Sequence, residues 1–503
     1  MQHLSEQEII RREKLNKIIE AGVNPYPAPL YPVSHLSTSA KATFEANPEE
    51  KLDVCIAGRI MSLNDKGKVI FIKIQDSEGI MQCYVKRDEI CPTEDKTFFD
   101  EVVKRFDLGD IIGAKGYMFV TKTGETSVHT NELTLLSKSL KPLPVVKRDD
   151  EGNTFDEVTD PEFRYRQRYA DLVVNPHVKE VFIKRTKMMQ AIREFLNSRG
   201  ALEVDTPVLQ AIPGGAAARP FNTHHNALDV PMYMRIANEL YLKRLIVGGF
   251  DFVYEFSRNF RNEGMDRTHN PEFTVLEFYT AYKDYEWMMN TTEELLEKVA
   301  IATNGTHLAE VGDKTISFKA PFKRITMFDA IKEHTGHDIS NMDEDGIRDV
   351  CKQLHLQVPL NIGKGKLIDE IFGEFCEHTY IQPTFITDYP VEMSPLTKKH
   401  RSKEGLVERF ELMINGKEVA NAYTELNDPI DQRARFEEQV ALMERGDDEA
   451  MFIDHDFLRA LEYGMPPTSG IGFGIDRLCM LLTNQHSIQD VLFFPMMRPE
   501  NFE

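Results

Sequence analysis

Charged and aromatic side chains gather in one short segment, residues 256–279, which reads FSRNFRNEGMDRTHNPEFTVLEFY. Side chains alternate between the two faces of a β-strand, so Arg261 and Glu263 are expected to share a face. On the returning strand a ring, a carboxylate and a phenol share a face in the same way: Phe273, Glu277 and Tyr279. Arginine offers a fork of donors that suits a phosphate, and a flat ring suits a purine. The segment predicts a hairpin that holds a phosphate, a purine and a small charged molecule, rather than a salt-bridged surface hairpin.

A second hairpin is predicted over residues 409–428, RFELMINGKEVANAYTELND, because Asn415-Gly416 is a strong two-residue turn signal. Glu411 and Glu418 are candidate ligands for Mg²⁺, which prefers carboxylate and phosphate oxygens. A simple turn puts these two on one face and three further polar residues on the other: Asn421, Tyr423 and Glu425. A one-residue bulge near 418–421 brings all of them to one face. The alternative for this segment is a half-exposed sheet edge.

A third candidate segment, PPTSGIGFGIDRLCMLLTN, places three alternating glycines before a helix that carries Arg477 in its first turn. Glycines let a ligand approach the backbone closely, and a helix N-terminus favours anions. The spacing is not that of a Rossmann dinucleotide fingerprint. Two smaller features join it, a loop IPGGAAARPF that contains Gly214 and a helix start at Glu239. A glycine-rich loop alone is a weak signal, and each of the two smaller features reads as an ordinary loop or cap when taken alone.

The elements that position these residues fall into two regions. Short strands with glycine-rich turns and one helical stretch near 98–107 predict an OB-type Greek-key barrel over 51–142. Residues 1–50 are expected to form an N-terminal helix and a linker. That helix is basic and carries an apolar stripe, which leaves open whether it packs on the barrel or contacts RNA.

The second region begins after a predicted linker at 143–170 and covers 171–503. It opens with a long amphipathic helix closed by Gly200, and strands and helices follow in alternation. The stretch 285–385 is predicted to be, in part, an inserted helical subdomain. The fold class expected from both regions is α+β.

Composition excludes several classes of protein. The formal net charge of −21 over 503 residues argues against indiscriminate nucleic-acid binding, but not against recognition through local patches. The six cysteines are scattered with no CxxC pair, which argues against a disulfide framework or a zinc site and favours a reducing cytoplasm. No apolar run is long enough for a membrane span, and the polar N-terminus does not resemble a signal peptide.

The three segments GALEVDTP (200–207), FSRNFRNE (256–263) and GIGFGIDR (470–477) resemble, in order and spacing, the signature motifs of class II aminoacyl-tRNA synthetases. With the barrel, the chain resembles the aspartate–asparagine–lysine subgroup, and its lysine-specific members over nearly the whole length. The resemblance implies a catalytic domain built on a six- to seven-stranded antiparallel sheet flanked by helices. It also implies a homodimer with the 180–207 region at the interface, with ATP, L-lysine and tRNA(Lys) as substrates and Mg²⁺ as cofactor.

The resemblance also implies roles for single residues. ATP binding would fall to Arg261, Glu263, His269, Phe273 and Arg477, with the two arginines catalytic; Mg²⁺ binding would fall to Glu411 and Glu418. The lysine pocket would comprise Gly214, Glu239, Glu277, Tyr279, Asn421, Tyr423 and Glu425, and the anticodon contacts would be Arg59, Phe71 and Gln82. Asn238 stands where relatives commonly have proline, which is expected to hold Glu239 less firmly.

The expected function is a cytoplasmic lysine–tRNA ligase that acts in translation. It would form lysyl-adenylate and pyrophosphate from lysine and ATP, then transfer lysine to the 3′ end of tRNA. One alternative is an enzyme that lysylates an elongation factor, but such relatives lack the N-terminal barrel. Another is an inactive paralogue that binds RNA, against which the four intact charged residues argue: Arg261, Glu411, Glu418 and Arg477.

Overall fold

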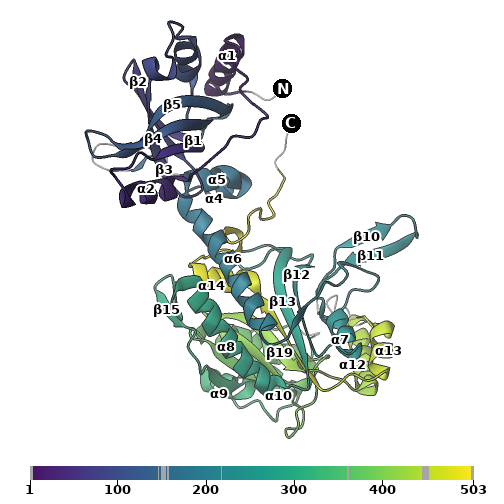
Figure 1. Cartoon of the computed structure of the whole chain (residues 1–503). Helices are drawn as coiled ribbons and strands as arrows, with labels where there is room; N and C mark the ends of the chain where they lie inside the picture. The colour runs from purple at the N-terminus through teal and green to yellow at the C-terminus, as the bar shows by residue number, and fades with distance from the viewer. Residues whose placement is uncertain are drawn as a thin grey trace. The chain divides into compact units, whose positions relative to one another are not determined.

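The computed structural model describes residues 4–144, 147–148, 154–155, 158–216, 218–359, 362–444 and 452–499. The chain divides into two compact units, Met1–Val158 and Thr159–Glu503 (Figure 1). Part of the predicted linker 143–170 lies outside the described residues, namely 145–146, 149–153 and 156–157. Its described residues contain four short elements: β6 (Lys147–Arg148), β7 (Thr154–Phe155), α4 (Pro161–Arg166) and the start of α5 (Arg168–Val174).

The first unit contains the predicted barrel. Five strands close in the order β1-β2-β3-β5-β4, with bounds Asp53–Asp65 (β1), Val69–Gln75 (β2), Ile80–Lys86 (β3), Ile111–Val120 (β4) and Thr126–Ser137 (β5). Three short helical elements lie between β3 and β4: α3 (Arg87–Ile90), η1 (Phe98–Val102) and η2 (Val103–Arg105). Burial along β2 alternates with period two, so Ile70, Ile72 and Ile74 fill the barrel interior.

Two helices lie against this barrel. In α1 (Glu6–Glu20), Ser5 and Glu8 form a capping box, and the buried Arg11 donates to the carbonyl oxygens of Leu108 and Ser139 at 2.9 and 3.1 Å. The N-terminal helix therefore packs on the barrel, and the guanidinium of Arg11 binds the barrel backbone. The other helix, α2 (Ser37–Ala46), falls in the region predicted to be only a linker. The proline-rich sequence PYPAPLYP just before it predicts an extended chain, and the helix was therefore not predicted.

The second unit is built on an eight-stranded sheet in the order β16-β17-β18-β19-β20-β13-β12-β8. The bounds are Lys323–Thr326 (β16), Thr384–Thr387 (β17), Arg409–Ile414 (β18), Lys417–Thr424 (β19), Thr468–Gly474 (β20), Glu272–Ala281 (β13), Phe252–Phe260 (β12) and Leu202–Glu203 (β8). The centre is antiparallel, as predicted. The two edges are not, because β16 runs parallel to β17 and β8 runs parallel to β12.

One face of this sheet is apolar and is covered by three helices: α6 (Pro176–Asn197), α8 (Tyr285–Asn304) and α14 (Ile475–Thr483) (Figure 1). Alternate strand residues such as Tyr254, Phe278, Ala422 and Phe473 join side chains of the helices in one core. Each helix turns a buried apolar side to the sheet, including Ile192 of α6, Leu296 of α8 and Leu478 of α14, so burial of both surfaces stabilises the layer. The opposite face of the sheet is thereby left for polar residues.

The stretch 285–385, predicted to be in part an inserted helical subdomain, divides between the sheet layer and a separate core. It supplies α8, the helix over the sheet's apolar face, and the sheet strands β16 and β17. A separate core forms only around α9 (Met327–Thr335), α10 (Glu344–Gln353) and α11 (Lys364–Phe375). The chain leaves the sheet after β16, forms α9, α10 and α11, and returns to the sheet as β17. No local sequence pattern marks this return.

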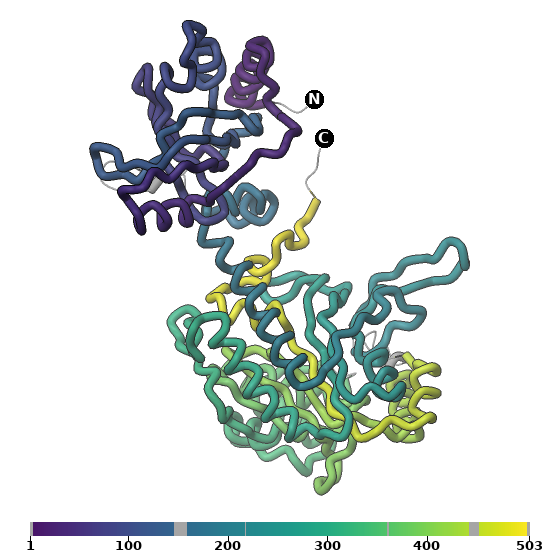
Figure 2. Tube along the Cα trace, viewed as in Figure 1, coloured from purple at the N-terminus to yellow at the C-terminus, as the bar shows by residue number. Residues whose placement is uncertain are grey.

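The remaining elements border the sheet. They are β9 (Leu209–Gln210), β10 (Asn222–His225), β11 (Val230–Met234), α7 (Glu239–Val247), β14 (Leu308–Val311), β15 (Lys314–Ser317), η3 (Glu377–Thr379), η4 (Val391–Met393), α12 (Pro429–Glu444), α13 (His455–Glu462) and η5 (Ile488–Asp490). The segment after α14 runs beside α6 (Figure 2), where the rings of Phe182 and Phe493 stack 3.8 Å apart. No helix in the described ranges is both long and apolar enough to span a lipid bilayer.

Candidate active site on the polar face of the sheet

The register of β18 and β19 explains how their polar residues reach one face. Asn415 and Gly416 both have positive φ, 53° and 70°, as the predicted two-residue turn requires. Met413 pairs with Glu418 but Leu412 pairs with Ala420, so one residue of β19 bulges out. The bulge predicted near 418–421 is thereby confirmed. It puts five polar side chains on the same face of the sheet: Glu411, Glu418, Asn421, Tyr423 and, just past the strand end, Glu425.

The glycines of β20 form the floor between this hairpin and the neighbouring one. Gly470 pairs with Tyr423 on one side and with Tyr279 on the other, and Gly472 lies between Asn421 and Glu277. A Cβ atom at Gly470 would lie 2.2 Å from Glu425 Oε1 and 2.3 Å from Tyr279 Cε1. The absence of a side chain at this position therefore lets residues of two strands converge above it.

Three buried carboxylates converge at this end of the face: Glu239, Glu277 and Glu425. Glu239 is the first residue of α7 and accepts a hydrogen bond from the Tyr423 hydroxyl at 2.6 Å. The Tyr279 hydroxyl donates to Glu277 at 3.0 Å. Glu425 Oε1 is buried with no hydrogen-bond partner. A pocket with several carboxylates and an unused acceptor suits a ligand that carries ammonium groups.

The pKa values in this pocket reflect burial and mutual repulsion. Burial, followed by the charge of Glu239, raises the pKa of Glu277 to about 8. Burial also raises the pKa of Glu425, against the lowering effect of Lys243. Ionisation of these groups is costly in the free protein and becomes favourable when cations enter, as expected at a functional site.

A cluster of cations lies further along the same face. Arg261 is partly buried, its guanidinium Cζ lies 5.1 Å from the centroid of the Phe273 ring, and its Nε has no hydrogen-bond partner. Arg477 lies in the first turn of α14, where its Nη2 is 3.3 Å from His269 Nε2. The structure thus brings four of the predicted ATP residues together in two pairs. Arg477 also donates to the carbonyl oxygen of Glu418 at 2.7 Å. A flat ring beside guanidinium groups suits a nucleotide.

The structure corrects the strand argument for Arg261 and Glu263. β12 ends at Phe260, so both residues lie beyond it, and strand alternation does not orient them. The backbone of Arg261 still pairs with the carbonyl of Pro271 at 2.9 Å, whereas Glu263 is exposed on the loop. β12 and β13 are connected by a long loop, residues 261–271, rather than by a tight turn. The strand pairing between them therefore ends before Arg261.

The two candidate metal ligands fit a divalent cation. Glu411 and Glu418 share the polar face; burial and then the charge of Glu418 raise the pKa of Glu411 to about 7. In the described part of the chain no three His, Cys, Asp or Glu side chains converge on a metal position. Mg²⁺ is commonly held by one or two carboxylates together with phosphate oxygens, and the repulsion between the two glutamates is what such an ion relieves.

Gly214 and Asn238 both bear on the position of Glu239. A Cβ at Gly214 would lie 3.0 Å from Leu240 Cδ1, so its loop reaches the start of α7 beside Glu239. The buried Asn238 donates to Glu255 at 3.0 Å and accepts from the Ser257 hydroxyl at 3.2 Å. These bonds tie the helix start to β12, and the expected slight loosening of Glu239 relative to a proline at 238 stays a prediction.

Two cations that the sequence analysis missed complete the face. Arg409 donates to Glu411 at 2.6 Å and to Asn421 at 3.1 Å, and Lys243 lies 2.6 Å from Glu239. Lys243 follows Glu239 by four residues on a helix, a spacing that predicts contact. Arg409 lies two residues before Glu411 on a strand, so period-two alternation already puts them on one face.

The barrel carries a separate aromatic surface. Phe71 is half-buried on the outer side of β2, opposite Tyr84 with ring centroids 5.4 Å apart, so it is not part of the barrel core. Three more rings adjoin Tyr84 or one another on that side: Tyr117, Phe119 and His129. Gln82 pairs with Lys73 on the same side, two residues from Tyr84. Arg59 pairs with Gln75 and donates to Gly109 O at 2.8 Å, which places it further along the barrel. Half-buried rings on the outer side of an OB barrel suit stacked bases.

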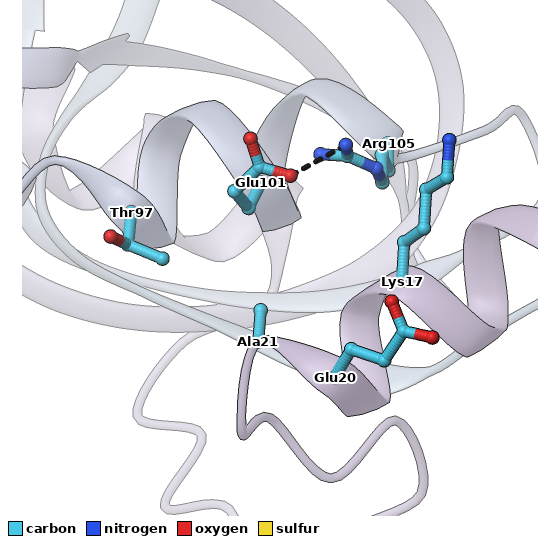
Figure 3. A pocket seen from close by; sticks show the side chains of 6 residues that line it. All are labelled: Lys17, Glu20, Ala21, Thr97, Glu101 and Arg105. Atoms are coloured by element: carbon cyan, nitrogen blue, oxygen red, sulfur yellow. Dashed lines mark ion pairs between the residues drawn. The ribbon is translucent and has the colours of Figure 1, made fainter.

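A shallow pocket of about 390 Å³ also lies in the first unit, between α1 and the helical turns at 97–105 (Figure 3). Its lining is polar and open: Lys17, Glu20, Ala21, Thr97, Glu101 and Arg105. Arg105 is already paired with Glu101 at 2.6 Å. None of these six lining residues is buried, so the chemistry is better placed on the polar face of the sheet.

Comparison with known proteins agrees with both regions. Residues 160–498 match the family model of class II tRNA synthetases (D, K and N), and residues 54–136 match that of the OB-fold nucleic-acid-binding domain. The chain is 64% identical over 499 residues to the lysine–tRNA ligase of Porphyromonas gingivalis, covering 99% of this chain and 86% of that one. The corresponding ligase of Christiangramia forsetii is 63% identical over 501 residues (99% and 87%), and that of Azobacteroides pseudotrichonymphae 60% over 501 (99% and 100%). The chain belongs to the class II tRNA synthetases of the D, K and N group and, within them, to the lysine–tRNA ligase family.

Proposed function

We propose that this chain activates L-lysine with ATP and then esterifies the lysine to tRNA(Lys). The observation that carries the proposal is the joint placement of two groups on one sheet face. The carboxylates of Glu239, Glu277 and Glu425 form a buried pocket for two ammonium groups. Arg261 and Arg477 offer cations for phosphates along the same face. An amino acid with a cationic side chain and a nucleotide could therefore be held side by side.

The first step needs no nucleophile from the protein. A carboxylate oxygen of lysine attacks the α-phosphorus in line, the bond to pyrophosphate breaks, and lysyl-adenylate forms. We assign Arg261 to the α-phosphate, Phe273 and Glu263 to the adenine, and Arg477 with His269 to the γ-phosphate end. Catalysis then rests on positioning and on neutralising phosphate charge. In the second step the 3′-hydroxyl of the tRNA's terminal adenosine attacks the lysyl carbonyl, and AMP leaves.

Glu411 and Glu418 are assigned to Mg²⁺. When bound there with ATP, the ion would neutralise charge on the phosphate oxygens. Arg409 donates to Glu411 at 2.6 Å and thereby fixes the orientation of that carboxylate.

The pocket residues are assigned to the two ends of lysine. Glu239 and the loop at Gly214 would bind the α-amino group, with Glu277 and Asn421 beside it. Tyr279 and Glu425, together with Tyr423, would surround the ε-ammonium group. A buried carboxylate without its cation costs about 3–5 kcal/mol, so uncharged analogues are strongly disfavoured.

We further propose a homodimer and a cytoplasmic location. Supporting the first, apolar side chains stay exposed in and beside residues 180–207: Ile183, Leu202, Val208 and Leu209. Exposed apolar groups clustered on one surface suit a subunit interface. The mass in solution from light scattering tests this directly.

The function is tested by lysine-dependent exchange of labelled pyrophosphate into ATP, measured with each of the standard amino acids in turn. Exchange with lysine alone, followed by aminoacylation of tRNA(Lys), is the expected result. Exchange without tRNA charging would favour a ligase that modifies a protein instead. Absence of exchange with every amino acid would point to a non-catalytic RNA-binding protein.

The aromatic surface of the barrel is assigned to the anticodon, with Phe71 stacking on a base and Gln82 and Arg59 reading or orienting it. Phe71→Ala is expected to raise the KM for tRNA about 5- to 100-fold, because a base–aromatic stack contributes about 1–3 kcal/mol. Lysine-dependent exchange, which needs no tRNA, should keep its rate. Initial rates of aminoacylation and exchange for the same preparation check this, and a loss of exchange would contradict the separation of roles.

The pKa of Glu277 predicts how lysine use depends on pH. Glu277 faces Glu239, Tyr279 and Glu255, and with a pKa of about 8 it is mostly protonated at pH 6.5. Binding of an ammonium group favours its ionised form, so kcat/KM for lysine should rise about tenfold from pH 6.5 to 8. Exchange rates at subsaturating lysine measure this. The KM for ATP serves as the internal control, and a flat lysine profile would show that Glu277 does not titrate in this range.

A further inference from the structure

Lys243 is a wholly buried cation in the pocket that we assign to lysine. Its Nζ lies 2.6 Å from Glu239 Oε1 and forms an ion pair with Glu425 Oε2. The rings of Tyr423 and Phe457 flank it, with centroids 5.4 and 5.9 Å from Nζ. Burial lowers the pKa of Lys243, but the charges of Glu239 and Glu425 raise it by more, so the ammonium stays charged.

The contacts of Lys243 use only one oxygen of each carboxylate. In the described part of the chain, Glu239 is contacted through Oε1, by both Lys243 and the Tyr423 hydroxyl. Glu425 meets Lys243 through Oε2, while its Oε1 is buried without a partner above Gly470. Each carboxylate is thus fixed in orientation by one oxygen and keeps the other for a ligand.

The titratable groups around Lys243 come from α7, β13, and β19 with the residues just after it. Glu239 lies on α7 with it, Glu277 and Tyr279 on β13, Tyr423 on β19 and Glu425 just beyond β19. α13 contributes the ring of Phe457. Three carboxylates and one ammonium group leave two negative charges when all are ionised. Lysine brings two ammonium groups to this pocket, and its own carboxylate is the group that reacts with ATP.

We propose that Lys243 is a positioning residue that adapts the pocket to a substrate with two ammonium groups. It holds Glu239 and Glu425 by one oxygen each and neutralises one of three buried negative charges. The inference rests on the proposed lysine-activating function and adds a residue to it. Without Lys243, a carboxylate in addition to Glu277 must take up a proton at neutral pH, and lysine must displace that further proton in order to bind.

The test is Lys243→Met, which keeps an unbranched side chain one atom shorter and removes its charge. The KM for lysine in the exchange reaction should rise about 30-fold or more at pH 7, as for loss of one partner of a buried charge pair. The KM for ATP should stay within about twofold. Lysine titrations in two buffers of different ionisation enthalpy should show about one more proton released on binding than in the unmodified chain.

The matched control is Lys138→Met in the barrel. Lys138 is also wholly buried and pairs with Asp107 at 2.6 Å and Asp110 at 2.9 Å. Its loss should lower thermal stability and leave the KM for lysine unchanged. If Lys243→Met does not fold, Lys243→Gln, which keeps a donor but no charge, undergoes the same two measurements.

The outcomes separate the inference from the proposed function. No exchange with lysine by the unmodified chain overturns the proposed function itself. Exchange by the unmodified chain, with an unchanged lysine KM and proton count in the variant, overturns the inference alone. A parallel rise in the KM values of lysine and ATP, or failure of both Lys243 variants to fold, would assign Lys243 a general structural role and also overturn it.

Discussion

Replacing Arg261 with alanine is expected to lower the rate of lysine-dependent ATP–pyrophosphate exchange by about 10²- to 10³-fold, as for loss of a preorganised donor at a site of developing charge. The guanidinium lies 5.1 Å from the Phe273 ring, its Nε is buried without a partner, and burial lowers its pKa. A cation held in this way has its charge available for a phosphate. Measurement of kcat at saturating lysine and ATP checks the prediction.

The control for Arg261→Ala is Arg258→Ala on the same hairpin. Arg258 is exposed and lies 3.5 Å from Glu272 in a surface ion pair, which typically contributes about 0–1 kcal/mol. Its loss should leave exchange nearly unchanged. Both variants should keep the oligomeric state of the unmodified chain in light scattering. Near-normal exchange by Arg261→Ala would remove Arg261 from the phosphate site, and with it the argument for an adenylate.

Much of the site follows from local sequence because strand periodicity and turn chemistry are local. Asn415-Gly416 predicts its turn from backbone conformation alone, since both residues adopt positive φ readily. The need to bring Glu411 and Asn421 to one face then predicts the bulge that the register shows. Likewise the alternating Gly470 and Gly472 mark a strand that other side chains approach closely. At the turn and the bulge the partners lie within about ten residues of one another, whereas the side chains that approach Gly470 come from distant strands.

What sequence reasoning missed depends on contacts between distant segments. Lys243 pairs with both Glu239 and Glu425. Its helical spacing predicts the pair with Glu239, but Glu425 follows β19, far away in the sequence, so no local pattern predicts the second pair. The stretch 285–385 has helical segments that look separable, yet its strands β16 and β17 complete the sheet edge. Arg261 was assigned to a face by strand alternation, but β12 ends one residue earlier. Strand ends and sheet edges are set by tertiary hydrogen bonding, which periodicity does not encode.

The second large effect is expected at Glu425, where Glu425→Gln should weaken lysine binding about 100-fold or more, because a charge pair in a buried site loses one partner. Glu425 is only 1% exposed, and its Oε1 has no hydrogen-bond partner. Glutamine keeps the shape and the acceptor oxygen but removes the negative charge. Lys243 then lacks one of its two counter-ions and competes with the substrate's ammonium group for Glu239. Isothermal titration with lysine and, separately, with ATP measures the two affinities.

Binding of ATP should change by no more than about twofold, because Arg261, Phe273 and Arg477 make no contact with Glu425 among the interactions of the described residues. Glu293→Gln is the matched control. Glu293 is buried too, but it lies on α8 and accepts from the Phe322 amide at 3.0 Å, away from the polar face. An equal loss of lysine affinity in both variants would mean that any buried carboxylate change disturbs the fold. A loss confined to Glu425→Gln, with ATP binding intact, would place the charge of Glu425 at the bound ammonium group, where a neutral side chain of the same shape cannot replace it.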